Sequence, residues 1–223
     1  HGERKSLFKD DQIKLFFFIL TVLIIITSLW LNNINHDLFF SIRISLFNIT
    51  SILTGTGFTS ANYNMWGSFG LVIMIIIMFI GGCAGSTTGG IKIFRLQLLF
   101  RGATTQIKKL TQPHGVFITS FNGKSVTDET FNSIMSFFFI YILIFILASL
   151  GLSFFNLDFI TAFSAAASAI SNVGPGLGVN IGPDSNYSSI PNAAKWILSF
   201  TMLIGRLELF TFLVILSLSF WKK

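Results

Sequence analysis

Long apolar runs alternate with short polar segments along the whole chain. Four of the runs approach or exceed the roughly 20 apolar residues that a membrane-spanning helix needs: 15–31, 69–80 continuing past an interruption to 100, 134–154 and 196–220. Two shorter runs, 38–53 and 159–170, rise at about 1.5 Å per residue and are too short to span comfortably. The pattern predicts four crossings and two re-entrant helices.

The order of spanning helix, short helix, glycine-containing turn and spanning helix occurs twice. A gapless alignment of Gly57 with Gly174 also sets the two short helices against each other. We therefore predict an all-α membrane protein with two repeats of transmembrane helix, re-entrant helix with loop, and transmembrane helix, in which the second transmembrane helix of the first repeat is broken by a glycine-rich loop. The repeats occupy 1–110 and 131–223, and the polar stretch 111–130 is a cytoplasmic linker.

Charge supports a membrane setting and gives an orientation. Only 11% of the 223 residues are charged, against about 25% in soluble domains. The net charge of +6 comes from basic residues beside apolar runs, which argues against a nucleic-acid partner. With a cytoplasmic N-terminus, the positive-inside rule places these residues at the inner side: Arg4, Lys5, Lys9, Lys14, Lys92, Arg95, Arg101, Lys108, Lys109, Lys124, Lys222 and Lys223.

The sequence offers no residues for enzyme chemistry. Its single cysteine excludes an internal disulfide, and its three histidines are too scattered for a zinc or haem site. Paired carboxylates, or a nucleophile with its base, do not occur in a membrane context. We expect a protein that is not an enzyme and has no organic cofactor.

The first candidate site follows the first short helix and consists of Thr54, Gly55, Thr56, Gly57 and Phe58. A cation that crosses a bilayer needs its lost hydration replaced, which backbone carbonyls do when glycine supplies the necessary dihedral angles. The helix also directs its partially negative C-terminus toward the ion. Alone, this string is more often an ordinary turn. Irregular backbone at membrane depth, however, is tolerated only in a protein interior or a water-filled cavity, which favours a selectivity filter.

The second candidate site follows the second short helix and consists of Ser171, Asn172, Val173, Gly174 and Pro175. A helix-capping glycine followed by proline would look the same, and the two interpretations are compatible. Recurrence at equivalent places favours a filter. We expect a dehydrated cation at the backbone carbonyls of Thr56, Gly57, Val173 and Gly174.

The third candidate site interrupts a membrane helix and contains Gly81, Gly82, Cys83, Ala84, Gly85, Ser86, Thr87, Thr88, Gly89 and Gly90. A phosphate-binding loop is rejected, because the segment lacks the Gly-Lys-Ser/Thr ending and does not follow a strand. A mobile polar loop below the filter would act as a gate, its hydroxyls satisfying the exposed backbone. The alternative is a passive helix kink.

Arg206 lies about 15 Å into the bilayer if the last helix starts near Trp196. A charge buried there is a functional candidate by default. Glu208 lies on a different helix face and is not an obvious partner. We expect Arg206 to face the ion path and to tune its barrier or brace the gate loop; a structural salt bridge to another helix is the alternative.

Four motifs, TGTGF, GGCAGSTTGGIK, NVGPGLGV and AKWILSFTMLIGRLELFTFLVIL, resemble the C-terminal half of the Trk/Ktr/HKT potassium-transporter superfamily, in particular its TrkH branch. The resemblance implies four potassium-channel-like repeats around one pore, of which this chain holds the third and fourth, and K⁺ as the ion at the carbonyls of Thr56, Gly57, Val173 and Gly174. It also implies that Gly57 and Gly174 are filter glycines, that 81–90 is the gate loop and that Arg206 is its pore-side arginine. Further implications are a homodimer in the cell inner membrane and a cytoplasmic nucleotide-binding regulatory subunit related to TrkA.

Half of such a filter is missing from the sequence. Either preceding residues are omitted or two chains combine, and the first is favoured because the two turns differ. We expect potassium uptake through a carbonyl-lined filter with an intramembrane gate loop. The alternatives are a permease for both Na⁺ and K⁺, an H⁺- or Na⁺-coupled secondary transporter with broken helices and a non-conducting membrane scaffold.

Overall fold

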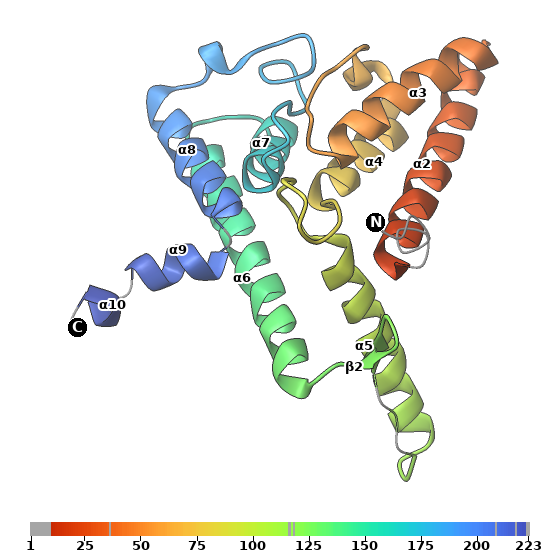
Figure 1. Cartoon of the computed structure of the whole chain (residues 1–223). Helices are drawn as coiled ribbons and strands as arrows, with labels where there is room; N and C mark the ends of the chain where they lie inside the picture. The colour runs from red at the N-terminus through yellow and green to blue at the C-terminus, as the bar shows by residue number, and fades with distance from the viewer. Residues whose placement is uncertain are drawn as a thin grey trace, which may run out of the picture.

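Helices make up most of the structure, a computed structural model that describes residues 10–35, 37–115, 117, 119–207, 209–216 and 218–221 (Figure 1). In chain order the elements are α2 (Asp11–Asn35), α3 (Leu38–Leu53), the 3₁₀ helix η1 (Tyr63–Met65), α4 (Gly67–Phe79), α5 (Ile93–Thr111), β1 (Ser120–Phe121), β2 (Lys124–Ser125), α6 (Asp128–Ser153), α7 (Phe159–Ser171), the 3₁₀ helix η2 (Tyr187–Ser189), α8 (Asn192–Arg206), α9 (Leu209–Leu216) and α10 (Leu218–Trp221).

The helices form two packed groups with the same internal arrangement. In the first group α3 packs against α2 and α4, and in the second α7 packs against α6 and α8. Contact between α4 and α7 joins the groups, and both short helices lie toward the same end of the molecule (Figure 1). Each group thus begins with a long helix followed by a short one, as predicted, but the helices that follow, α4 and α8, contain only 13 and 15 residues.

Each short helix begins at an aspartate that accepts a backbone hydrogen bond. Asp37 accepts from the Phe40 amide at 3.1 Å, and Asp158 accepts from the Thr161 amide at 3.1 Å. A carboxylate at a helix N-terminus satisfies a free amide and complements the helix dipole. The two helices contain 16 and 13 residues, which gives lengths of roughly 24 and 20 Å.

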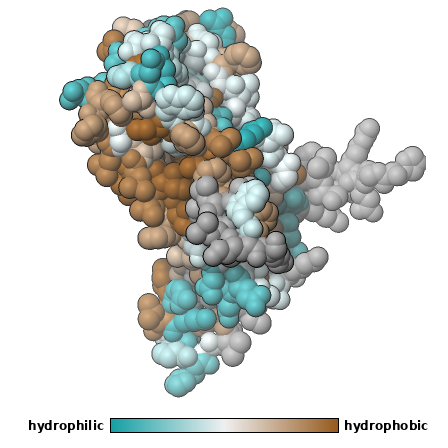
Figure 2. Space-filling model, turned by 90° about the vertical axis from the view of Figure 1, so that its left-hand side faces the viewer, coloured by the Kyte–Doolittle hydropathy of each residue, from teal (hydrophilic) through white to brown (hydrophobic). Residues whose placement is uncertain are grey.

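The surface has an apolar band between polar ends (Figure 2). Two helices among the described residues, Asp11–Ile34 and Asp128–Ser153, are long and apolar enough to cross a membrane. Large side chains such as Phe18 and Phe139 face outward at 65% and 68% exposure. Inside, α7 is lined with small residues whose short side chains allow neighbouring backbones to approach closely: Ala162, Ala165, Ala166, Ala167 and Ala169.

The predicted linker contains a small hairpin. Ser120 pairs with Ser125 and Phe121 with Lys124 in an antiparallel register. Asn122 and Gly123 form the turn with φ angles of 47° and 77°. An Asn-Gly pair with both φ angles positive is typical of the tight turn that matches strand twist.

The prediction of one spanning helix over 196–220 is wrong. Helix α8 ends at Arg206, and α9 leaves it in a different direction (Figure 1). Gly205 gives a physical reason, because glycine weakens a helix and its missing side chain lets the α8 backbone press against α7. A Cβ atom there would lie 2.0 Å from the Ile170 carbonyl oxygen.

Several residues used for the orientation and for Arg206 lie outside the described part of the chain: Arg4, Lys5, Lys9, Glu208, Lys222 and Lys223.

Candidate functional site

The first predicted filter segment is an irregular turn at the C-terminal end of α3. Gly55 and Gly57 have φ angles of +67° and +79°, in the region that favours glycine. The amides of Thr56 and Gly57 both donate to the carbonyl oxygen of Ser51, at 2.9 and 3.3 Å. The turn is thus fixed to the helix end through its N–H groups.

The second predicted segment is fixed to α7 in the same way. Val173 donates its amide to the Ser168 carbonyl at 3.0 Å, and Gly174 donates to the Ser168 hydroxyl at 3.0 Å. Ser51 and Ser168 each lie six residues before the glycine of their turn. Asn172, with φ of 55°, ends the helix in the left-handed conformation that asparagine tolerates.

A buried polar side chain from each short helix holds the segment that leaves the turn. Asn48 is fully buried; its Oδ1 accepts from the Ser60 amide at 3.1 Å and its Nδ2 donates to the Ser60 hydroxyl at 2.9 Å. Ser164 accepts from the Leu177 amide at 2.8 Å. Ser60 and Leu177 both lie three residues beyond their glycines. Sequence reasoning missed Asn48 and Ser164, although a polar residue inside a short apolar helix was a usable signal.

The two turns meet in space. A Cβ atom on Gly57 would lie 2.2 Å from the Val173 carbonyl oxygen and 3.3 Å from Cδ of Pro175. Glycine is therefore needed at position 57 for two reasons: the backbone has a positive φ, and the two main chains approach each other closely there. Gly174 has φ of +109°, and a Cβ there would meet nothing within 4 Å.

Tyr187 also acts on the second turn and was not found from the sequence. Its hydroxyl donates to the Gly174 carbonyl oxygen at 2.8 Å. Burial raises the pKa of this phenol, and a hydrogen bond with the Ser168 side chain opposes that change. The hydroxyl therefore remains protonated, and so a donor, at neutral pH. The residue comes from the longer outer loop of the second half.

A reciprocal amide pair joins the two halves beyond the turns. Asn64 Nδ2 donates to the Gly178 carbonyl at 3.0 Å, and the Gly178 amide donates to Asn64 Oδ1 at 3.0 Å. This pair fixes the segments that follow the two turns relative to each other.

The glycine-rich loop that separates α4 from α5 is folded on itself. Its neck is closed by two backbone bonds of 2.9 Å, from Gly81 to Ile91 and from Ile91 to Phe79. Inside the loop the Gly82 amide donates to the Thr88 hydroxyl at 2.8 Å, which also bonds the Ser86 hydroxyl at 2.6 Å. Hydroxyl groups thus satisfy the backbone, as the sequence predicted.

This loop lies against both turns. A Cβ atom on Gly55 would be 3.6 Å from Cγ2 of Thr88, and one on Gly89 would be 2.3 Å from the Ser171 carbonyl oxygen. All three segments singled out in the sequence are therefore neighbours.

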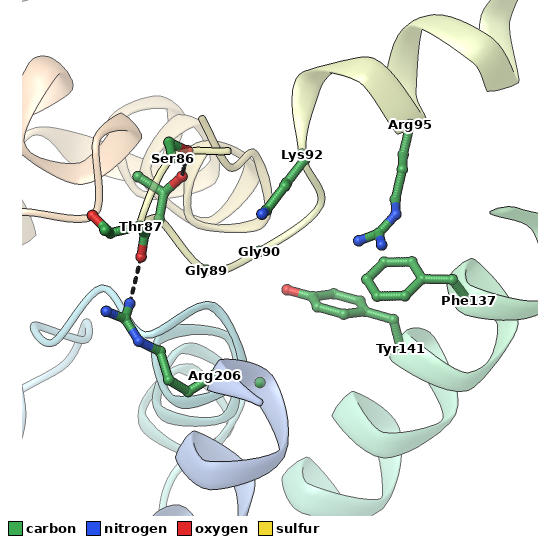
Figure 3. Close-up of a pocket in the computed structure, with 11 residues that line it drawn as sticks. Ser86, Thr87, Gly89, Gly90, Lys92, Arg95, Phe137, Tyr141 and Arg206 are labelled. Atoms are coloured by element: carbon green, nitrogen blue, oxygen red, sulfur yellow. Dashed lines mark hydrogen bonds between the residues drawn. The ribbon is translucent and has the colours of Figure 1, made fainter. Parts of the chain in front are cut away.

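Arg206 contacts the loop from α8 through a hydrogen bond from its guanidinium to the Thr87 carbonyl oxygen (Figure 3). Both lie at a cavity of about 180 Å³ whose lining includes Lys92 and Arg95. The predicted proximity of Arg206 to the loop is thus present in the structure.

Two aromatic residues of α6 complete the cavity and were missed from the sequence. The Arg95 guanidinium lies 3.7 Å from the centre of the Phe137 ring, a cation–π distance. Tyr141 lies beside Phe137 (Figure 3), and its hydroxyl bonds the hydroxyl of Ser171, the first residue of the second segment, at 2.7 Å. The cavity therefore borders the loop and three cationic side chains, and Tyr141 connects it to the second turn.

Comparison with known families gives a match of residues 4–222 to the family described as TrkH, cation transport protein. The chain belongs to the TrkH family. Membership implies a membrane protein, in agreement with the apolar outer surface, and confirms the resemblance found in the sequence.

Named relatives agree with this family. The chain is 40% identical over its whole length to the Trk system potassium uptake protein TrkI of Halomonas elongata, of which it covers 45%. It is 34% identical to TrkH of Escherichia coli K12, with 98% of the chain matched to 45% of the relative. The crystal structure of the potassium transporter TrkH from Vibrio parahaemolyticus superposes with a TM-score of 0.90 at 34% identity, covering 98% of this chain and 47% of that one.

The chain thus spans a little under half the length of these TrkH-family relatives. Each of them is named as a transport protein, which is consistent with the expectation that the chain is not an enzyme.

Proposed function

We propose that this chain supplies half of a pathway for potassium uptake. The two turns would form two sides of a carbonyl-lined selectivity filter, and two further repeats outside this chain would form the rest. The observation that carries the proposal is the meeting of the turns, with Val173 O against Gly57 directly above the glycine-rich loop. Relatives named as potassium uptake proteins support K⁺ as the cargo.

The ion would bind to the backbone carbonyls of Thr56, Gly57, Val173 and Gly174. Replacement of its hydration shell by carbonyl dipoles needs no fixed charge, and the C-terminal ends of α3 and α7 add a favourable field. Tyr187 uses one lone pair of the Gly174 carbonyl, and a carbonyl oxygen retains a second.

The loop of residues 81–90 would act as the gate. It contacts the inner side of both turns through Thr88 and Gly89, so an ion that leaves the filter meets it next. Arg206 would brace the loop and place a positive charge on the path, which raises the barrier to cations.

The wider arrangement follows from the same proposal. Residues 1–110 would be a third-type pore repeat and 131–223 a fourth-type repeat, with 111–130 as the cytoplasmic linker. The complete protein would be a multi-pass homodimer of the cell inner membrane that binds a TrkA-like nucleotide-binding subunit.

Rubidium uptake into liposomes that contain the complete protein tests the proposal. Gly57→Val should abolish uptake or the preference for Rb⁺ over Na⁺, because Cβ meets the Val173 carbonyl. Gly67→Val is the matched control, since Gly67 has a similar φ of +73° and its Cβ position makes only an ordinary contact, with Trp30 at 3.7 Å. Equal uptake and selectivity in both variants would refute the filter.

A coupled secondary transporter is the second candidate, because helices are interrupted at corresponding places of both halves, between α4 and α5 and between α8 and α9. Imposed gradients of H⁺ or Na⁺ distinguish the two functions. A coupled carrier accumulates Rb⁺ against its own gradient, whereas a permease does not.

A further inference from the structure

The gate loop has a second anchor, on the side opposite Arg206. Oε1 of Gln12, in the first turn of α2, accepts a hydrogen bond from the Ala84 amide at 2.9 Å, across 72 residues of sequence. Other loop amides and hydroxyls bond within the loop, as for Gly82 and Ser86. The bond to Gln12 instead ties the loop to a different helix.

The turn that carries Gln12 is itself held by the cytoplasmic hairpin. Asn122, at the hairpin tip, accepts from the Asp11 amide at 3.2 Å and donates to the Asp10 carboxylate at 3.2 Å. The same Asp10 oxygen accepts from the Gln12 amide at 2.9 Å. The Asn122 carboxamide thus caps α2 from 111 residues away.

Arg101 of α5 also bonds both the first turn of α2 and the hairpin. Its guanidinium pairs with the Asp11 carboxylate at 2.8 Å and also donates to the Ser120 carbonyl of β1. Figure 1 shows the hairpin beside α5 and near the lower end of α2. The side chains of Arg101 and Asp11 are 35% and 32% exposed, so water and salt weaken the pair and it can open.

We propose that Gln12 is a positioning residue for the gate loop, and that the hairpin of residues 119–126 controls how firmly Gln12 holds it. The inference rests on the proposed function, in which this loop is the gate. Displacement of the hairpin removes Asn122 from the α2 N-terminus, loosens the first turn and releases Ala84. The position of the cytoplasmic hairpin thereby controls the gate loop inside the membrane.

The first test measures rubidium flux through the complete protein in liposomes, without a regulatory subunit. Gln12→Leu keeps a side chain of similar length but removes the acceptor, and should raise flux about fivefold, the factor that one net hydrogen bond represents. Gln12→Glu retains the acceptor oxygen and should restore low flux. Gln106→Leu, on an exposed position of α5, is the matched control and should leave flux unchanged.

The second test separates the hairpin from general destabilisation. Asn122→Gly tolerates the positive φ of this position and removes only the carboxamide. It should raise flux less than Gln12→Leu, and the double variant should equal Gln12→Leu alone, because both changes act on one connection. A nitroxide attached to Cys83, with other cysteines replaced, should become more mobile in each variant that raises flux.

Two different failures can be told apart. If deleting residues 82–89 raises flux but Gln12→Leu leaves flux and Cys83 mobility unchanged, the gate stands and the role of Gln12 is overturned. If the deletion itself leaves flux unchanged, the proposed gate is refuted. Additive effects of Gln12→Leu and Asn122→Gly would overturn the connection to the hairpin.

Discussion

Gly57 and Gly174 hold similar places in their turns but are constrained differently. Both have positive φ, yet only Gly57 lies within 2.2 Å, measured from a Cβ position, of another main-chain atom. A positive φ alone costs an L-residue about 1–2 kcal/mol. A Cβ atom at position 57 would in addition overlap the Val173 carbonyl oxygen, so one of the two turns would have to move.

We therefore expect Gly57→Ala to destabilise the protein more than Gly174→Ala. The free energy of unfolding should fall by about 1–2 kcal/mol for Gly174→Ala and by more for Gly57→Ala. Thermal unfolding in detergent measures both. An equal loss would mean that the Val173 carbonyl moves aside freely.

Tyr187 places a hydroxyl donor on a proposed ion ligand. Tyr187→Phe removes the donor while keeping the ring, and should change the ratio of Rb⁺ to Na⁺ permeability by up to about fivefold. Because burial raises the pKa of the phenol, the donor remains present up to the ordinary tyrosine pKa of about 10. In the wild type this ratio should therefore stay constant between about pH 6 and pH 9. A ratio unaffected by Tyr187→Phe would contradict a role in the filter.

At the scale of elements, the glycine-rich loop fits its site through individual glycines. Gly89 packs against the end of α7, with its Cβ position 2.3 Å from the Ser171 carbonyl oxygen, while Gly85 has open space around it at φ of +81°. Substitutions at Gly89 and Gly85 therefore distinguish two effects: Gly89 tests how the loop packs against α7, and Gly85 tests the backbone conformation of the loop.

Gly89→Ala should push the loop away from α7 and raise basal rubidium flux several-fold, about the factor expected for 1 kcal/mol or more of lost packing. Gly85→Ala, which strains φ but meets no atom, should change flux much less. Flux measurements on the two complete proteins provide the comparison. A passive kink predicts no increase in either variant.

Element order was predictable from apolar run lengths, because a short apolar run between two long ones has few other placements in a membrane. The break after Arg206 was not, since apolar residues continue on both sides of Gly205 and Arg206 and the cause is a tertiary contact at Gly205. The 119–126 hairpin was also missed, although Asn122-Gly123 is a strong local turn signal. Their glycines identified the segments of the candidate site in the sequence. Asn48, Tyr187 and Gln12 were missed, because each acts through a hydrogen-bond partner elsewhere in the chain.

For the whole molecule, the two halves are in contact at the turns, at the segments that follow them, and along the helix pairs α4–α7 and α5–α6. The halves meet where Gly57 faces Val173, and Asn64 pairs with Gly178. Large apolar side chains such as Phe18 and Phe139 face outward, and the face shown in Figure 2 has an apolar band, so the helices present a lipid-compatible surface. The seam between the halves, in contrast, includes the polar pair of Asn64 and Gly178.

Asn64→Ala should lower the stability of the whole protein by about 1–3 kcal/mol, because it leaves the Gly178 amide and carbonyl without these bonds. Asn132→Ala, at an exposed position of α6, is the control and should stay within about 0.5 kcal/mol of wild type. Thermal unfolding in detergent provides the measurement. Equal stability of both variants would show that the seam does not depend on this pair.

The proposed gate loop comes from the first half, and Arg206, which donates a hydrogen bond to it, comes from the second. In the proposed function, closure therefore depends on both halves, and neither closes the pathway by itself. Changes that separate the two halves should therefore leave the pathway open. A poorly assembled molecule would first leak ions rather than lose transport.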